Sequence, residues 1–382
     1  MTDSLSLREA NRYDRQMRLP GVGADGQRRL RDTAVLVVGA GGLGSPVATY
    51  LAAAGVGRIG LVDFDTVDVS NLHRQPLYTE GDVGRLKVDA AAERLRTLNP
   101  HVSIETHPVR FDAETALDLV RHYDIVADGT DTFEARYLVN DACVVAGVAN
   151  VFASVSQFSG QVSVFGGFAG SGERGPCYRC VFPEAPPAGS VPSCAEGGVL
   201  GVLPGLVGTL QATEVLKRIL GVGDPLVGRL LLVDALSMAF QTLRVDRDPA
   251  CAVCGDAPSI LTLTDSAAVC GPIMTIPQMS VQELHALRQA GDGPFVLDVR
   301  EPDEFEGANI DGALIPLGEL LERIGELDAH RDDAVLVVHC RHGGRSAKAV
   351  EVLHSQGFTN AVNLTGGIHA WSDEVDPSLP KV

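Results

Sequence analysis

Cys340 begins a loop whose composition suits sulfur chemistry. The segment HCRHGGRS, residues 339–346, follows an apolar run and precedes a stretch of helical composition. Backbone amides in such a loop, together with the N-terminus of the next helix, stabilise a sulfur anion. The loop therefore suits a persulfide or a phosphorylated cysteine, and a strand-to-helix turn without chemistry is the plainer alternative. The candidate loop residues are Cys340, Arg341, His342, Gly343, Gly344 and Arg345.

A glycine-rich turn nearer the N-terminus is typical of nucleotide binding. The segment GAGGLG, residues 39–44, follows an apolar run and opens a segment of helical composition. Its glycines let backbone amides approach phosphates at a helix N-terminus. Asp63 ends the next apolar run, where a carboxylate can hold ribose hydroxyls. These two features alone fit an NAD-dependent dehydrogenase, and a glycine turn that binds nothing is a further alternative.

Charged residues after the second apolar run favour a triphosphate over a nicotinamide. Asp65, the run SNLHRQ at 70–75 and Lys87 follow it in the chain. Attack on a triphosphate needs nearby cations because negative charge builds on the leaving pyrophosphate, and Arg74 and Lys87 suit that role. Asp131 closes the segment DGTD after a later apolar run. It offers a carboxylate to magnesium at the usual ligand edge of an α/β sheet.

Four cysteines occur as two C-x-x-C pairs, Cys177 with Cys180 and Cys251 with Cys254. Four thiolates satisfy a closed tetrahedral zinc site, which would be structural. A thiol–disulfide pair and unliganded buried thiols are the alternatives. Cys194 stands apart in the turn-rich segment PSCAEGG, where a mobile loop could carry it, although a lone cysteine is more often inert packing.

The elements that would position these residues alternate between strands and helices, which indicates a parallel sheet. We read residues 256–276, which lack clean periodicity, as a linker between a domain at 1–255 and a smaller α/β domain at 277–382. Residues 151–167 look like β-rich hairpin segments. Strands are predicted over 34–39, 58–63, 102–106, 124–128, 295–299 and 334–339. Helices are predicted over 45–54, 87–98, 113–122, 205–220, 235–243, 281–289, 317–324 and 345–355.

Composition limits the class of partner. The chain has 382 residues and a net charge of −18, so its overall field repels polyanions and we expect no nucleic acid partner. The uncharged stretch 142–172 is too polar for a lipid-facing segment, and the start of the chain lacks a secretory signal. Eight cysteines are too few for a disulfide scaffold in a chain of this length. We therefore expect a cytoplasmic protein that does not bind membranes.

Two families are recognisable in these motifs. Residues from about 10 to 255 resemble the ubiquitin-activating-like adenylyltransferases of the MoeB and ThiF type, through RYDRQ at 12–16, GAGGLG, SNLHRQ, Lys87, DGTD and the paired C-x-x-C. Residues from about 276 resemble a rhodanese domain, through LDVREPDEF at 297–305, HCRHGGRS and NLTGGIHAW at 363–371. The order matches MoeZ-like fusion proteins. The resemblance implies a Rossmann-like adenylyltransferase domain with a mixed sheet, followed by a small α/β rhodanese domain.

The resemblance also implies an ATP site and a homodimer. Asp131 would lie near magnesium, and Arg15 would reach into the nucleotide site of a partner subunit. Thr132 departs from the family pattern, since many relatives have Asn there. Cys194 matches a cysteine that forms a covalent link to a small carrier protein in some relatives and is dispensable in others. The nucleotide-site residues would be Gly39, Gly41, Gly42, Gly44, Asp63, Asp65, Ser70, Asn71, Arg74, Lys87, Asp131 and Thr132.

The family relationship implies a reaction in two stages. The C-terminal Gly-Gly carboxylate of a small ubiquitin-like sulfur carrier attacks the α-phosphate of ATP, giving an acyl-adenylate and pyrophosphate. Cys340, loaded by a sulfur donor such as thiosulfate or a cysteine desulfurase, then transfers sulfur, giving a thiocarboxylate directly or through a disulfide resolved by Cys194. An NAD-dependent oxidoreductase, a non-enzymatic scaffold and a phosphatase using Cys340 are the alternatives, and related phosphatases generally have a loop one residue longer.

Overall fold

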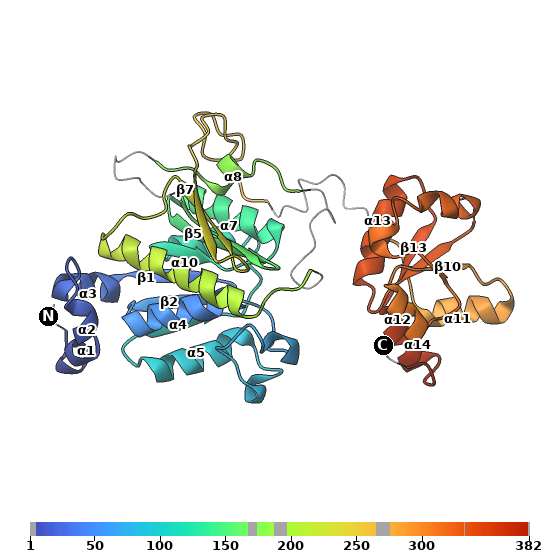
Figure 1. The fold of residues 1–382 in the computed structure, drawn as a ribbon, viewed down its shortest axis with the longest axis horizontal. Helices are drawn as coiled ribbons and strands as arrows, with labels where there is room; N and C mark the ends of the chain where they lie inside the picture. Colours follow the sequence, from blue (N-terminus) through green and yellow to red (C-terminus); the bar gives the residue numbers. More distant parts are fainter. Residues whose placement is uncertain (1–4, 167–173, 187–196, 265–275, 332, 381–382) are drawn as a thin grey trace. The chain divides into compact units, whose positions relative to one another are not determined.

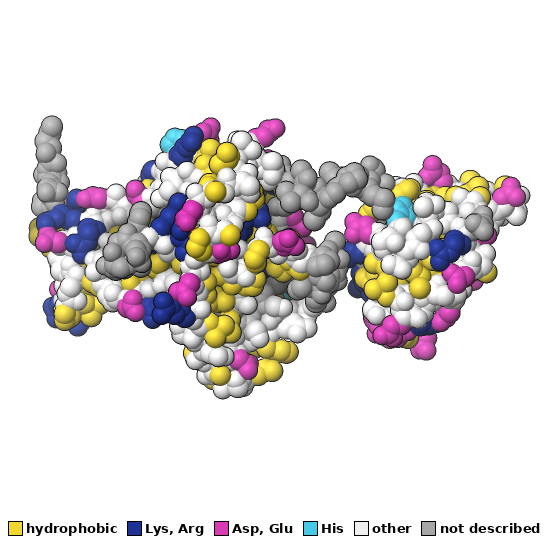
Figure 2. Space-filling view, turned by 90° about the horizontal axis from the view of Figure 1, so that it is seen from above, with side chains coloured by type: hydrophobic (Ala, Val, Ile, Leu, Met, Phe, Trp, Pro, Cys, Tyr) yellow, Lys and Arg dark blue, Asp and Glu magenta, His cyan; other side chains and the backbone are white. Residues whose placement is uncertain are grey.

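The computed structural model describes residues 5–166, 174–186, 197–264, 276–331 and 333–380. The chain forms two compact units, Met1–Gly271 and Pro272–Val382, and the boundary between them falls within the predicted linker. Each unit has its own sheet and its own buried core (Figure 1). Acidic and basic side chains are interspersed with apolar ones on the face drawn in Figure 2. Among the described residues, no helix has the length and apolar character needed to cross a membrane.

The larger unit is built on an eight-stranded mixed sheet in the order β3-β2-β1-β4-β5-β6-β7-β8. Strands β1 to β5 pair in parallel, whereas β6, β7 and β8 form antiparallel pairs. The order reverses between β1 and β4, and ligands bind outside the carboxyl ends of strands at such a point. The strands are β1 (Ala34–Val38), β2 (Arg58–Val62), β3 (Ser103–His107), β4 (Ile125–Asp128), β5 (Ala149–Ser156), β6 (Ser159–Phe165), β7 (Arg229–Asp234) and β8 (Ala239–Arg244).

Helices cover both faces of this sheet. Helices α10, α4 and α5 pack side by side over one face, where apolar residues of the strands form the largest core (Figure 1). Helices α6 and α7 pack together and close a second core. The helices of the unit are α1 (Leu7–Arg12), α2 (Asp14–Met17), α3 (Gly23–Asp32), α4 (Gly44–Ala54), α5 (Lys87–Leu98), α6 (Ala116–Arg121), α7 (Phe133–Ala146), α8 (Tyr178–Val181) and α10 (Val202–Leu220), with 3-10 turns η1 (Val69–Asn71) and η2 (Glu80–Asp82).

The smaller unit is a five-stranded parallel sheet in the order β11-β10-β12-β13-β9. Separate apolar cores cover its two faces. Its strands are β9 (Gln278–Met279), β10 (Phe295–Asp298), β11 (Ala313–Leu314), β12 (Leu336–His339) and β13 (Ala361–Leu364). Its helices are α11 (Val281–Ala290), α12 (Pro302–Gly307), α13 (Gly344–Ser355) and α14 (Gly367–Glu374), with 3-10 turns η4 (Leu317–Glu319) and η5 (Ile324–His330).

The predicted fold class is confirmed, and most predicted elements form within a few residues of their expected bounds. Two predicted helices are wrong. The segment 235–243 turns back after Asp234, whose carboxylate accepts hydrogen bonds from the Leu236 amide and the Ser237 hydroxyl, and then pairs as β8 against β7. The segment 317–324 begins after Pro316 and forms a short 3-10 turn instead of an α-helix. In segment 235–243, the turn at Asp234 and the hydrogen bonds to β7 outweigh the helix propensity of the residues.

Candidate functional site

The glycine turn joins β1 to α4 through two very close backbone approaches. Gly39 has a φ of +90°, and a Cβ added there would lie 2.8 Å from the carbonyl oxygen of Gly129. Gly44 begins α4, and a Cβ added there would lie 1.9 Å from the carbonyl oxygen of Gly39. Only glycine fits both positions. The remaining two glycines of the motif, Gly41 and Gly42, line an open cavity.

That cavity lies outside the carboxyl ends of β1, β2 and β4 and has a volume of about 890 Å³. Its volume is within the range of sites that hold a nucleotide-sized ligand. The cavity gathers residues from loops far apart in the sequence. The predicted residues that line it are Gly39, Gly41, Gly42, Asp63, Asp65, Asn71, Arg74, Lys87, Asp131 and Thr132.

Asp63, Asp65 and Lys87 form a charged wall of the cavity. The Oδ2 atom of Asp63 accepts a hydrogen bond from the amide of Ala40 over 2.8 Å, which ties β2 to the glycine turn. Lys87 donates from Nζ to Oδ2 of Asp65 over 2.8 Å. Burial raises the pKa of Asp63, and the positive charge of Lys87 opposes that shift. The ammonium group is therefore held at the cavity by the Asp65 carboxylate.

The segment after β4 places Asp131 at the rim. Oδ1 of Asp128 accepts hydrogen bonds from the amide and the hydroxyl of Thr130, at 3.0 and 2.7 Å, which fixes this turn. Burial raises the pKa of Asp128 to about 6. Asp131 is exposed. The hydroxyl of Thr132 accepts a hydrogen bond from the amide of Ala135 over 3.3 Å and so caps α7. The residue that departs from the family pattern therefore begins the helix beside the cavity.

Three predicted nucleotide-site or catalytic residues do not line the cavity. Gly44 is buried in the first turn of α4. Ser70 lies in η1, where its carbonyl oxygen accepts a hydrogen bond from Nη1 of Arg74 over 2.8 Å. Arg15 is exposed on α2. Cys194 lies outside the residues that the structure describes.

Sequence reasoning missed several residues of the cavity wall. Gln75 lies within the recognised SNLHRQ run, so the motif itself could have indicated it. Arg110 and Phe64 come from two different loops, and the Arg110 guanidinium lies 6.0 Å from the centre of the Phe64 ring. Arg136 on α7 is 8% exposed and lines the cavity. It belongs to no short motif, and its placement depends on how α7 packs.

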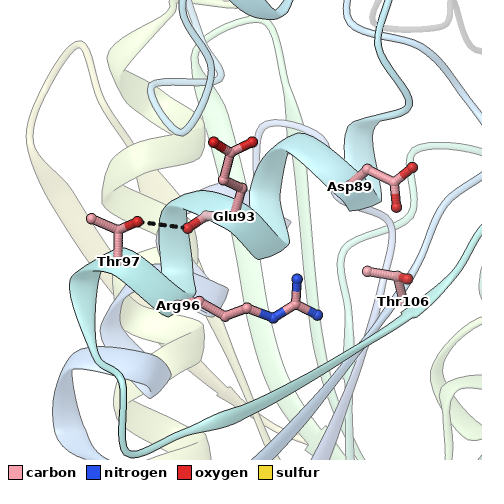
Figure 3. A pocket seen from close by; sticks show the side chains of 5 residues that line it. All are labelled: Asp89, Glu93, Arg96, Thr97 and Thr106. Atoms are coloured by element: carbon pink, nitrogen blue, oxygen red, sulfur yellow. Dashed lines mark hydrogen bonds between the residues drawn. The ribbon is translucent and has the colours of Figure 1, made fainter.

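A shallow hollow on the outer surface of α5 contains none of the predicted site residues. In Figure 3, Asp89 and Arg96 of this helix extend toward Thr106 of β3, and Glu93 and Thr97 also line the hollow. Charges of both signs lie side by side there. The predicted nucleotide-site residues line the larger cavity described above instead.

The four cysteines of the two C-x-x-C pairs meet in one cluster. Their sulfur atoms all lie within 4.8 Å of one another. The sulfurs of Cys177 and Cys251 are 3.5 Å apart, and those of Cys180 and Cys254 are 3.3 Å apart. Four thiolates at zinc–sulfur distances of about 2.3 Å require sulfur separations of this size, so the cluster fits a tetrahedral zinc ion.

The cysteine cluster is fastened to α7, the helix whose first turn lines the cavity. Arg179 donates two hydrogen bonds from Nε and Nη2 to the two oxygens of Asp141, at 2.9 and 2.8 Å. The amide of Tyr178 donates to Oδ1 of Asn140 over 2.7 Å. Beyond the predicted domain end at residue 255, Ile260 packs against the cluster, so the chain stays attached to the larger unit there.

Cys340 follows β12 and lies at the start of the loop that leads into α13. Its sulfur accepts hydrogen bonds from the amide of Gly343 over 3.2 Å and from the hydroxyl of Ser346 over 3.3 Å. The side chain is 2% exposed. Two donors aimed at one sulfur stabilise an anion there, as the sequence predicts.

The first turn of α14 contacts the backbone of the Cys340 loop. The amide of Ile368 donates to the carbonyl oxygen of Cys340 over 2.9 Å, and the amide of His369 donates to that of Arg341 over 3.2 Å. Gly367 has a φ of +60°, and a Cβ added there would lie 2.3 Å from the Cys340 carbonyl oxygen. The second glycine of NLTGGIHAW therefore permits the close approach between α14 and the Cys340 loop.

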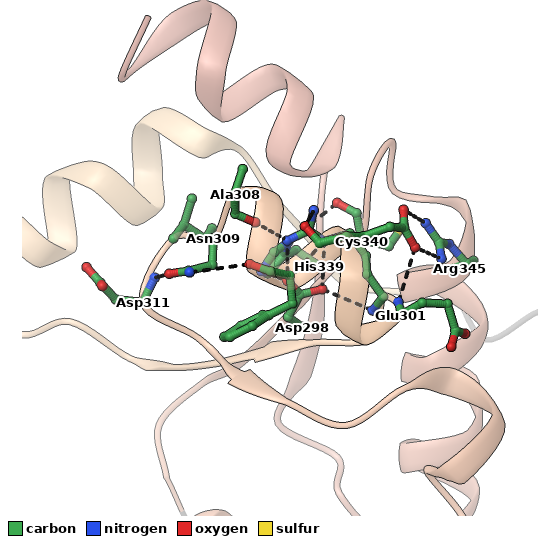
Figure 4. A network of polar contacts seen from close by, with 12 residues as sticks. Asp298, Glu301, Ala308, Asn309, Asp311, His339, Cys340 and Arg345 are labelled. Carbon is green, nitrogen blue, oxygen red and sulfur yellow. Dashed lines mark hydrogen bonds and ion pairs between the residues drawn. The ribbon is translucent and has the colours of Figure 1, made fainter. Parts of the chain in front are cut away.

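Buried charges lie beside the Cys340 loop (Figure 4). Arg300 is fully buried and donates to both oxygens of Asp298 and to the carbonyl oxygen of Ala308. His339 lies 3.5 Å from the same carboxylate, and burial lowers its pKa to about 4. Arg345 is paired with Glu304 at the end of the loop. Sequence reasoning singled out Arg345 but not its partner.

Both units match known families along most of their length. The ThiF family matches residues 13–253. The chain belongs to the ThiF family. The Rhodanese-like domain matches residues 280–374, so this ThiF-family chain carries a second, rhodanese-like domain. The predicted resemblance is confirmed, and the dehydrogenase alternative has no support from either match.

Relatives of this ThiF-family chain match nearly all of it or about two thirds of it. It is 42% identical to the probable adenylyltransferase/sulfurtransferase MoeZ of Mycobacterium tuberculosis over 98% of this chain and 96% of that protein. It is 57% identical to the sulfur carrier protein adenylyltransferase of Thermus thermophilus, over 69% of this chain and 97% of that protein. A crystal structure of E. coli MccB with MccA-N7isoASN shares the fold, with a TM-score of 0.57 at 24% identity over 65% of this chain and 76% of that chain.

Proposed function

We propose that this chain adenylates the C-terminal Gly-Gly carboxylate of a small ubiquitin-like sulfur carrier protein and then transfers sulfur to it from Cys340. The main observation in support is that ten predicted nucleotide-site residues line one cavity. The same chain also has the Cys340 loop, in which a backbone amide donates a hydrogen bond to the sulfur. The names of the two relatives, a sulfur carrier protein adenylyltransferase and an adenylyltransferase/sulfurtransferase, support it.

In the first stage the carrier carboxylate attacks the α-phosphorus of ATP, and the bond to pyrophosphate breaks. Arg74 and Lys87 line the cavity and would offset the charge that builds on the leaving pyrophosphate. Asp63, tied to the glycine turn, would hold the ribose hydroxyls. The mixed anhydride replaces a poor leaving group with AMP, which makes the chain end of the carrier electrophilic.

In the first stage, magnesium and a residue from a second subunit would also act at the cavity. Magnesium prefers oxygen ligands, and the exposed Asp131 carboxylate at the rim would hold it beside the phosphates, where the ion neutralises phosphate charge. Arg15, which lies away from the cavity of its own subunit, would act in the cavity of a partner subunit within a homodimer. The tetracysteine cluster would hold a structural zinc ion.

In the second stage the terminal sulfur of a Cys340 persulfide attacks the carrier carbonyl, and AMP leaves. A donor such as thiosulfate would supply that sulfur and release sulfite. The amide of Gly343 and the hydroxyl of Ser346 would stabilise sulfur anions through this cycle. A thiolate that then attacks the Cys340 sulfur frees the thiocarboxylate and forms a disulfide, and Cys194 is the candidate for that thiolate.

The test of the first stage is ATP–pyrophosphate exchange that depends on a Gly-Gly-ended carrier. We expect Asp131→Ala and Arg74→Ala to abolish the exchange, and Asp118→Ala, which changes an exposed carboxylate on α6, to leave it intact. Exchange that survives either cavity variant would refute that residue's role. For the second stage, Cys340→Ala should keep full exchange and lose sulfur transfer to the carrier, read by the mass of the carrier.

A further inference from the structure

Two histidines and an arginine gather beside the Cys340 loop. The rings of His342, in the loop, and His369, on α14, meet edge to face with their centres 4.3 Å apart. Nε of Arg341 donates a hydrogen bond to Nε2 of His369 over 3.2 Å. Arg341 and His342 are exposed and His369 is half-buried, so solutes reach this cluster from solvent.

Backbone contacts hold the cluster close to the sulfur. The amide of Gly343 donates to the Cys340 sulfur over 3.2 Å, so the two residues between them lie in a turn that closes on that atom. The Cα of His342 is two residues from that of Cys340, which limits their separation to about 8 Å. The amide of His369 donates to the carbonyl oxygen of Arg341 over 3.2 Å, which fastens α14 to the same turn.

The surroundings of His342 oppose its protonation. Burial lowers the pKa of His342, and neighbouring groups lower it further. These neighbours are His369 on α14 and the cations Arg341 and Arg345. Glu304 on α12 pairs with Arg345 and so offsets part of the positive field. An anion bound beside His342 reverses the balance, because its negative charge favours the protonated ring.

The donor named for the second stage carries the matching charge. Thiosulfate is a dianion whose terminal sulfur is attacked by the Cys340 thiolate. The S–S bond of the donor then breaks, and its electron pair leaves with sulfite. The molecule is short, so its sulfonate oxygens stay beside the turn while the terminal sulfur meets the thiolate. The donors to the Cys340 sulfur, from Gly343 and Ser346, are neutral and offer those oxygens no counter-charge.

We propose that Arg341, His342 and His369 form a proton-dependent anion subsite of the Cys340 loop, which binds the sulfonate end of a doubly charged sulfur donor more tightly when His342 is protonated. Arg341 supplies a fixed charge, and His369 positions that charge and the ring of His342. The subsite rests on the proposed function, because it serves the donor of the second stage. It makes the loop distinguish sulfur donors by charge, and more strongly at acidic pH.

The test compares two sulfur donors whose negative charges differ by one. Thiosulfate is a dianion and methanethiosulfonate a monoanion, and each delivers a terminal sulfur to the same thiolate. Mass spectrometry of the full chain gives the second-order rate constant of Cys340 persulfide formation for each donor, and their ratio cancels the ionisation of Cys340. Because the pKa of His342 lies below its usual value of 6.5, we expect the ratio of thiosulfate to methanethiosulfonate to rise about fivefold as the pH falls from about 7.5 to about 5.

Variants at His342 separate charge from shape. His342→Gln cannot gain a proton, and its ratio should stay low at every pH. His342→Lys carries a fixed charge, and its ratio should be high and independent of pH. His330→Gln removes a histidine that stacks on Phe295, at the opposite end of β10, and should keep the native response. A native ratio that does not change with pH, or a His342→Gln chain that retains the change, would overturn the proposal.

Inorganic sulfate tests the subsite without sulfur transfer. Sulfate is an unreactive dianion, and by linkage its binding should raise the pKa of His342, read from the histidine signals in NMR spectra of the full chain. Sodium chloride at equal ionic strength is the reference, and the titration of His330 should not respond to sulfate. A His342 titration that ignores sulfate refutes the subsite even if persulfide forms. If sulfate raises that pKa but neither donor forms a persulfide, the second stage of the proposed function fails and the subsite stands.

Discussion

Lys87 Nζ lies 2.8 Å from Oδ2 of Asp65, and the two side chains differ sharply in exposure, at 8% and 51%. The ammonium group is therefore desolvated while its partner remains in contact with water. A desolvated cation acts strongly on a phosphate that enters the same cavity. Lys87 is also the first residue of α5, so the helix itself fixes where the side chain begins.

Lys87→Met should lower carrier-dependent ATP–pyrophosphate exchange at least about a hundredfold, because it removes charge stabilisation from the leaving group. Asp65→Asn should cost less, since the cation remains. Exchange kinetics with varied ATP measure both effects. Lys217→Met, which breaks an ion pair with Glu214 on α10 outside the cavity, is the matched control. Equal losses in Lys87→Met and Lys217→Met would contradict the assignment.

The buried Asp128 should make the stability of the larger unit depend on pH. Burial raises its folded-state pKa from 3.8 to about 6. The proton that it binds therefore contributes stability below about pH 4, and this contribution is lost as the pH rises through 6. We expect Asp128→Asn to gain roughly 1–3 kcal/mol relative to the native chain between pH 4.5 and 7.5. Urea unfolding followed by far-ultraviolet circular dichroism measures the difference, and a gap that stays constant with pH would sink the prediction.

Gly44→Ala should prevent the β1–α4 turn from closing, because the new Cβ would meet the carbonyl oxygen of Gly39 at 1.9 Å. We expect a loss of more than about 3 kcal/mol in the free energy of unfolding of the larger unit. Gly205→Ala on α10 is the control, since no atom beyond its own stretch of helix lies within 4 Å of its added Cβ. That variant should gain up to about 1 kcal/mol from helix propensity. Similar melting temperatures for both variants would refute the packing argument.

Metal analysis of the purified chain should give one zinc ion for each chain. Cys180→Ser should lose the ion and lower the melting temperature of the larger unit by roughly 5 °C or more, because metal binding contributes folding free energy. Cys340→Ser changes a cysteine outside the cluster and should retain the zinc. Trp371, the sole tryptophan, lies in the smaller unit, and its fluorescence should not change on metal loss. Full zinc content in Cys180→Ser would contradict the site.

The lining of the candidate nucleotide cavity could be predicted in large part because its residues follow strands. Gly39, Asp63 and Asp131 each come after a recognisable apolar run, and the carboxyl ends of parallel strands meet at one edge. Arg136 could not be found in this way. It lies inside a helix with no motif of its own, and only the packing of α7 brings it to the cavity wall.

Long-range pairing explains the other gaps between sequence and structure. All six residues of β8 are exposed, so its sequence does not show the alternation of apolar and polar residues that indicates a strand. Its conformation is set by pairing with β7. Glu304 and Arg345 lie 41 residues apart, and no local pattern connects them. Short-range signals predict turns and helices well, whereas partners across a sheet or between loops follow from the assembled fold.

Both proposed reaction centres of this chain lie where parallel strands end, at the Gly39 turn after β1 and at Cys340 after β12. The two sheets share neither strand order nor size, yet in each the proposed site begins at the carboxyl end of a parallel strand. Substitutions in the segments that connect strand to helix can therefore change what each unit binds without altering the strands beneath. In this architecture, chemical diversity and structural robustness are encoded by different sets of residues.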